Sequence, residues 1–221
     1  NVSDRLEKTF TSVNFNMMIM IIYALITIAI FGMWYYARYE GNFLPSPKKT
    51  FNPMMIVAIV ILVPGTQFAA NFIANLTGYI RPDWLQQYNE LFETSGITDT
   101  TFVTVLYSVI LAPICEELIF RGVTMRCARK ALPFALANLM QAALFGLFHL
   151  NWIQGIYAFA LGIVLGYVCE RGGSIYYSMG LHLLFNLWGT LSGFFPDPGN
   201  SVVVFAVVIV VTIVSLVVGF V

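Results

Sequence analysis

Long apolar segments limit what this chain can fold into more than any other feature of its sequence. Seven of them occur, over residues 15–37, 53–78, 100–122, 132–150, 154–170, 174–195 and 201–221. A helix needs about 20 mostly apolar residues to cross the roughly 30 Å of hydrocarbon in a bilayer. Hydrophobic residues make up 59% of the 221 residues, and the mean hydropathy is +0.81, outside the range of soluble domains. The sequence predicts an all-α, polytopic transmembrane helix bundle of about seven spans.

The connection between the second and third segments has a different composition. It reads RPDWLQQYNELFETSGITD and mixes Trp84, Leu85, Leu91 and Phe92 with acidic residues. This mixture predicts an amphipathic helix lying at the membrane interface. The chain then divides into an N-terminal part, residues 1–99, a polar-motif core, residues 100–195, and a C-terminal transmembrane helix, residues 196–221. The N-terminal spans are a candidate surface for a membrane partner.

Net charge and cysteine content exclude two classes of protein. Eleven basic and eleven acidic residues cancel, so the chain has no basic face of the kind that collects nucleic acid phosphates. We expect no nucleic acid partner. The three cysteines are odd in number and lie in or beside apolar segments, which argues against a disulfide framework.

A few strongly polar side chains lie inside the predicted spans. An ionisable residue at membrane depth costs about 2.5–3.5 kcal/mol on insertion scales, so it tends to face a cavity or a partner and to have a function. Both histidines of the chain lie in apolar segments. The set comprises Glu116, Glu117, Arg121, His149, His182 and Asn186.

Helical spacing groups these residues in pairs. Glu117 and Arg121 are four residues apart, with the acid N-terminal to the base, which favours an ion pair on one helix face. His182 and Asn186 are also four apart, so both can point at one spot on a neighbouring helix.

The depth of these side chains in the membrane can be counted from the turn near Pro133. Glu117 and His149 each lie sixteen residues from that turn, which places both about 24 Å along their helices. Phe145 lies one helical turn before His149 and predicts an aromatic neighbour for that imidazole. By the same count His182 does not fall at this level, so only helix tilt or an uneven loop would bring it to the site.

Two prolines lie inside predicted spans, Pro64 and Pro113. Proline has no backbone N–H, and its ring clashes with the preceding turn, so it kinks or interrupts a helix. Pro113 precedes Glu117 by four residues, which predicts an opening of the helix beside the polar residues.

The residues alone leave several interpretations open. The Glu–Arg pair can be a structural lock, and a lone histidine in a span is often only an interhelical hydrogen-bonding group. Glu116, His149 and His182 are the ligand types of a catalytic zinc site, although they lack a compact H-E-x-x-H arrangement. The same groups can form the relay of an ion-coupled transporter. Cys115, beside Glu116, fits an inert buried thiol better than a nucleophile.

Three motifs in this order resemble the signature of a known family. Glu116-Glu117-x-x-x-Arg121, Phe145-x-x-x-His149 and His182-x-x-x-Asn186 are similar to the three motifs of the CPBP intramembrane proteases. That family includes CAAX prenyl endopeptidases of the Ras-converting type and bacterial relatives linked to bacteriocin maturation or immunity. The resemblance covers residues 100–195, four of the seven spans.

The resemblance implies hydrolysis of a peptide bond of a membrane-associated peptide or protein, within a four-helix catalytic core. It implies Glu116 as general base on water with His149 as its partner, and an oxyanion site formed by His182 and Asn186. Glu117, Arg121 and Phe145 would support them. We favour no metal, with a zinc-dependent version of the same protease as the alternative. An ion-coupled transporter or a non-catalytic immunity or scaffold protein are further alternatives. The chain is short, and we expect a multi-pass protein of the bacterial plasma membrane.

Overall fold

The structure is a computed structural model that describes residues 13–39, 52–95, 101–192 and 202–220. These residues form helices and no strands, which confirms the all-α prediction. The helices are α2 (Val13–Tyr39), α4 (Pro53–Ile80), α5 (Pro82–Ser95), α9 (Phe134–Phe148), α10 (Trp152–Gly172), α11 (Ile175–Ser192) and α12 (Val202–Phe220). A further long helix runs in sections from α6 (Phe102–Val105) through η1 (Leu106–Leu111), α7 (Ala112–Glu117) and η2 (Leu118–Met125) to α8 (Arg126–Ala128).

Each of the seven predicted apolar segments contains a helix, but the helices differ in length. Four described helices are long and apolar enough to cross a membrane, namely Phe15–Arg38, Pro53–Ile80, Phe102–Ala128 and Trp152–Gly172. Helix α9 has 15 residues, about 22 Å at 1.5 Å per residue, which is less than the hydrocarbon thickness. It stops because the chain reverses at Leu150, whose φ is 53°. The protein is therefore an integral membrane helix bundle that combines long and shorter apolar helices.

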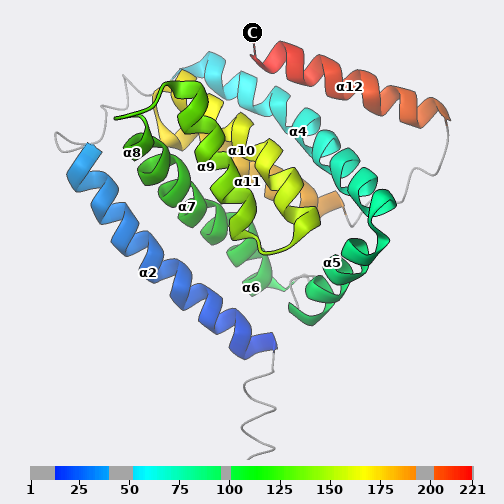
Figure 1. Ribbon diagram of the computed structural model, residues 1–221, viewed down its shortest axis with the longest axis horizontal. Coiled ribbons are helices and arrows are strands. Elements are labelled where there is room, and N and C mark those ends of the chain that lie inside the picture. The colour runs from blue at the N-terminus through cyan, green and yellow to red at the C-terminus, as the bar shows by residue number, and fades with distance from the viewer. Residues whose placement is uncertain (1–12, 40–51, 96–100, 193–201, 221) are drawn as a thin grey trace, which may run out of the picture.

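The helix from Phe102 to Ala128 lies in the middle of the bundle (Figure 1). Helix α2 contacts it from one side, through η1, α7 and η2, and α9 and α11 contact it from the other. Helix α4 packs against α10, α11 and α12. Helix α5 lies at one end of the bundle and contacts α4 and α10 (Figure 1). Helices α9 and α11, which carry the two histidines, therefore both pack on the helix that carries the two glutamates.

Glycines let α9 and α10 approach closely. A Cβ placed on Gly146 would lie 2.5 Å from the carbonyl oxygen of Gly155, and one on Gly162 would lie 3.1 Å from the Cβ of Ala142. One on Gly166 would lie 1.9 Å from Oδ1 of Asn138. Small residues at a helix interface permit this packing in membranes, where the hydrophobic effect does not drive helices together.

Replacing Gly166 tests this interface. We expect Gly166→Ala to lower stability by about 1–3 kcal/mol, the usual effect of overpacking, because Asn138 must give up its position. Gly180, inside α11, is a matched control, since a Cβ there would meet nothing within 4 Å. We expect Gly180→Ala to be neutral or slightly stabilising. Thermal unfolding of the two variants in detergent measures the difference, and equal unfolding temperatures would contradict the close contact.

Helix α5 is the predicted amphipathic helix, found over Pro82–Ser95; residues 96–99 of the predicted segment lie outside the described residues. Trp84, Tyr88 and Phe92, spaced by four, are its half-buried side chains. Trp84 stacks on Trp152 at the start of α10, with ring centroids 5.3 Å apart, and the Arg81 guanidinium lies 4.1 Å above the Trp84 ring. These contacts fix α5 against the end of the bundle.

Candidate active site

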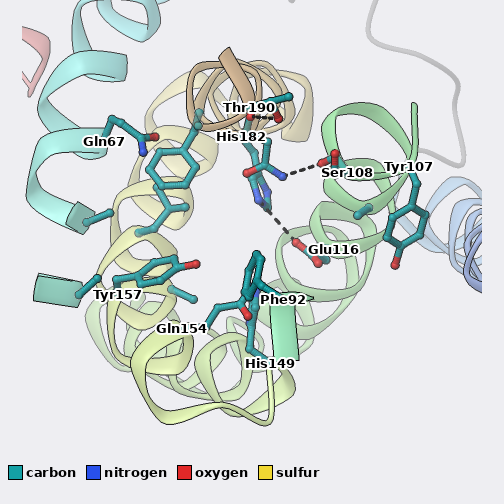
Figure 2. Close-up of a pocket in the computed structure, with 18 of the residues that line it drawn as sticks. Gln67, Phe92, Tyr107, Ser108, Glu116, His149, Gln154, Tyr157, His182 and Thr190 are labelled. Atoms are coloured by element: carbon teal, nitrogen blue, oxygen red, sulfur yellow. Dashed lines mark hydrogen bonds and ion pairs between the residues drawn. The ribbon is translucent and has the colours of Figure 1, made fainter. Parts of the chain in front are cut away.

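A cavity of about 720 Å³ lies between the central helix and helices α4, α5, α9, α10 and α11. The four predicted catalytic residues line it, namely Glu116, His149, His182 and Asn186, and so does the predicted supporting residue Phe145. Figure 2 shows Glu116, His182 and His149 around one side of the space, with Gln67 and Tyr157 on the opposite side. The structure thus brings together polar side chains from three helices that are separate in sequence, as the motifs predict.

The adjacent glutamates have different environments. Neighbouring residues of a helix point about 100° apart, so one of the pair turns to the cavity and the other away from it. Glu116 lines the cavity, and its side chain is 16% exposed. Glu117 is fully buried, and its Oε1 accepts a hydrogen bond from Nη1 of Arg121 over 2.8 Å. The predicted ion pair between Glu117 and Arg121 is confirmed.

His182 lies between the two carboxylates. Its Nδ1 is 3.0 Å from Oε1 of Glu117, and its Nε2 is 3.5 Å from Oε2 of Glu116 (Figure 2). Because a carboxylate only accepts hydrogen bonds, Nδ1 carries the proton, which leaves Nε2 of the neutral ring as an acceptor facing Glu116. The depth count that placed His182 at another level was wrong, since a count from one turn contains no information on where α11 starts or how it tilts.

His149 is held by the end of its own helix. His149 is the C-cap residue of α9, and its Nδ1 lies 2.8 Å from the carbonyl oxygen of Phe145. That carbonyl is one of four left without a helical partner at a C-terminus. A carbonyl only accepts, so Nδ1 carries the proton, and Nε2 is the remaining acceptor. The imidazole in contact with Glu116 is that of His182, whereas the resemblance implied His149 as its partner.

Phe145 packs against three of the charged or ionisable groups. It is 1% exposed. The guanidinium carbon of Arg121 lies 4.5 Å from its ring centroid, a cation–π contact. The rings of His149 and His182 lie 4.9 and 5.7 Å from it, both edge to face. Phe145 therefore packs against all three groups, and the aromatic neighbour predicted for His149 is confirmed.

Behind Arg121 lies a polar network that the sequence analysis missed. Nη2 of Arg121 donates to the carbonyl of Gly162 over 3.2 Å, and Nε2 of Gln141 donates to the same carbonyl over 2.9 Å. Gln141 also donates to Oδ1 of Asn138 over 2.7 Å, and Asn138 donates to the carbonyl of Ile163. The signal in the sequence was two carboxamides, three residues apart, inside an apolar segment. The network links α9, α10 and the central helix beneath the cavity.

Asn186 is held by the central helix. Its Nδ2 donates to the backbone carbonyl of Ser108 over 2.8 Å. Ser108 was not predicted as part of the site, because a backbone carbonyl leaves no mark in the pattern of side chains. Other cavity-lining polar residues were not predicted either, namely Gln67, Asn71, Gln154, Tyr157 and Thr190.

Glu116, His149 and His182, the ligands of the alternative zinc-dependent version, are not gathered into a metal-binding group in this structure. Among the described residues, no group of three or more His, Cys, Asp or Glu side chains lies close enough to hold a metal ion.

Cys115 has no access to the cavity. Its thiol is buried and lies 3.3 Å from the carbonyl oxygen of Ala24 in α2. This contact agrees with the interpretation of Cys115 as a buried structural thiol.

Comparison with known proteins places the segment that carries these residues in a family. Residues 98–188 match the sequence model of the family described as type II CAAX prenyl endopeptidase Rce1-like. No curated protein and no solved structure is significantly similar to the chain. The matched segment contains every predicted site residue, from Glu116 to Asn186. The segment that carries the predicted site residues is thus similar to the type II CAAX prenyl endopeptidases, a family of proteases, in agreement with the resemblance of its motifs to the CPBP intramembrane proteases.

Proposed function

We propose that the protein hydrolyses a peptide bond of a membrane-associated peptide or protein inside this cavity. One observation carries the proposal. A partly exposed carboxylate, Glu116, faces the cavity 3.5 Å from the imidazole of His182, while a second carboxylate and an arginine behind them hold that imidazole in place. A base with a positioned imidazole beside it is the arrangement required to activate water.

Glu116 is the proposed general base. It removes a proton from a water molecule in the cavity, and the resulting hydroxide attacks the carbonyl carbon of the substrate. Nε2 of His182 can take up this proton, because its Nδ1 proton is held by Glu117. Nε2 of His149 is available to accept the second hydrogen of the same water and so to orient it. The proton finally moves to the leaving amine, which completes hydrolysis.

Asn186 and His182 are the proposed donors to the oxyanion. Asn186 has two amide protons on Nδ2, and one of them is used by Ser108, so the other can bind the negative oxygen. His182 donates from Nε2 once it has gained a proton. Donors preset at a developing oxyanion typically contribute about 3–4 kcal/mol to catalysis.

The cavity also suggests how the substrate is held. Gln67 of α4 lies across the cavity from Glu116 (Figure 2), and its Oε1 is buried without a hydrogen-bond partner among the described residues. A buried carboxamide oxygen without a hydrogen bond destabilises the protein, and a peptide N–H of the substrate can supply the missing hydrogen bond. Tyr88 and Phe92 of α5 add an aromatic wall. These groups suit an extended, partly apolar segment of a substrate in a bacterial plasma membrane, the proposed setting.

Incubation of the full chain in liposomes with membrane-anchored peptides tests the proposal. We expect two peptide products, with one ¹⁸O atom in the new carboxyl group when the reaction is run in H₂¹⁸O. A parallel sample with a metal chelator separates the mechanisms, since glutamate-activated water predicts an unchanged rate, and a zinc-dependent reaction predicts loss that added zinc restores. Intact peptides after reaction with every anchored substrate, or products without ¹⁸O, would contradict hydrolysis.

A further inference from the structure

The central helix changes its winding near Pro113, from π-helical turns before it to the α-helical turns of Ala112–Glu117, and it is π-helical again over Leu118–Met125. Residues Leu106–Leu111 form π-helical turns, in which an N–H bonds to the carbonyl five residues earlier. The N–H of Ala112 accordingly bonds to the carbonyl of Tyr107. Isolated π turns in α-helices are uncommon, and many occur at functional sites.

This winding leaves one backbone carbonyl without a backbone partner. In an α-helix the carbonyl of Ser108 would accept from the N–H of Ala112, but that N–H is used by Tyr107. In a π-helix it would accept from residue 113, which is proline and has no N–H. Ser108 therefore has a carbonyl that neither register satisfies, at a position lining the cavity.

Asn186 satisfies this carbonyl from another helix. Its Nδ2 lies 2.8 Å from the carbonyl oxygen of Ser108, across 78 residues of sequence. A carbonyl oxygen only accepts hydrogen bonds, so the carboxamide must present its NH₂ group, and not its oxygen, on this side. The contact thereby sets the orientation of the Asn186 carboxamide.

We propose that Pro113 is a positioning residue for Asn186. Because Pro113 has no N–H, the Ser108 carbonyl remains available to accept a hydrogen bond from the NH₂ group of Asn186. The second amide proton of Asn186 is then left for the oxyanion. The role of that last proton rests on the proposed function, whereas the positioning itself does not.

A second proline provides a comparison within the same protein. Pro64 lies inside α4, and there the neighbouring N–H of Gly65 donates to the hydroxyl of Ser215 in α12 over 3.0 Å. Here too a polar side chain from another helix fills an opened turn, but neither Pro64 nor Ser215 lines the cavity. Pro64→Ala is thus a matched control for the loss of an intramembrane proline.

Steady-state kinetics of the full chain in liposomes test the positioning. Pro113→Ala supplies an N–H that competes for the Ser108 carbonyl, and we expect kcat to fall roughly 10- to 100-fold with KM unchanged. Pro64→Ala should keep the parental kcat. In the Asn186→Ala background, Pro113→Ala should cause no additional loss, because the group that it positions is already gone. A parental kcat for Pro113→Ala, or losses that simply add in the double variant, would overturn the inference.

An NMR measurement tests the positioning of Asn186 independently of any cleavage activity. In protein labelled with ¹⁵N-asparagine in detergent micelles, the two side-chain amide protons of Asn186 are assigned by their loss in Asn186→Ala. We expect Pro113→Ala to shift the hydrogen-bonded proton and to speed its exchange with water, and Pro64→Ala to leave it unchanged. An unshifted Asn186 signal in Pro113→Ala refutes the positioning even if the parent protein cleaves. A shifted signal in a protein that cleaves nothing refutes the protease proposal alone.

Discussion

Replacing Glu116 by glutamine is expected to abolish detectable cleavage, with a fall in rate of about 10²- to 10⁴-fold, the usual contribution of a general base. Glutamine has the same shape but cannot take a proton from water. The side chain is partly exposed to the cavity, and its contact is the 3.5 Å approach to His182, so we expect the fold to persist. Initial cleavage rates in liposomes, together with thermal unfolding of the same samples, measure both effects.

Glu170→Gln is the matched control for this experiment. Glu170 is also a carboxylate at a helix of the bundle, but it pairs with Arg129 at the surface over 3.1 Å and does not line the cavity. We expect the cleavage rate of Glu170→Gln to equal that of the parent. If Glu116→Gln cleaved as fast as this control, the general base would have to be another residue, and the proposed mechanism would fail.

Replacing Arg121 by methionine is expected to destabilise the protein by about 3–5 kcal/mol, the effect of breaking a buried ion pair by removing one partner. Arg121 and Glu117 are both fully buried. Without the guanidinium, the buried charge of Glu117 loses its paired cation, and the Gly162 carbonyl and the Phe145 ring each lose a contact. Thermal or denaturant unfolding in detergent measures the loss.

Two further variants separate the charge effect from simple truncation. Arg81→Met removes the same side chain from an exposed pair, in which Arg81 holds the pKa of Asp83 below its ordinary value through their hydrogen bond. Because both partners are exposed and the contact of Arg81 with the Trp84 ring is also at the surface, we expect at most a small loss of stability, well below that of Arg121→Met. The double variant Glu117→Leu/Arg121→Met should recover much of the lost stability, since no charge remains buried. It should stay inactive, since Nδ1 of His182 loses its acceptor. Equal destabilisation by Arg81→Met and Arg121→Met would contradict the burial argument.

Much of this fold could be predicted because its main determinant is local. A run of about 20 apolar residues has to be helical in a bilayer, where each backbone polar group needs a partner within its own segment. The pairing of Glu117 with Arg121 and the contact of Phe145 with His149 are equally local, since each pair is one helical turn apart. The cost of burying charge also singled out the residues that would meet at one site.

The helices, the composition of the site and the pairs within single helices thus follow from the order of the amino acids. The packing of the helices sets three other features: Glu117, and not Glu116, is buried beneath the cavity, His182 contacts both carboxylates, and Gln67 of α4 lies across the cavity from Glu116. These features depend on how the helices tilt and how closely they approach one another. Glycines such as Gly166 of α10 permit a close approach to a helix that is distant in sequence. They depend also on the π turns before Pro113, because one additional residue in a turn rotates everything after it by about 100°, and a 3.6-residue pattern cannot show that rotation.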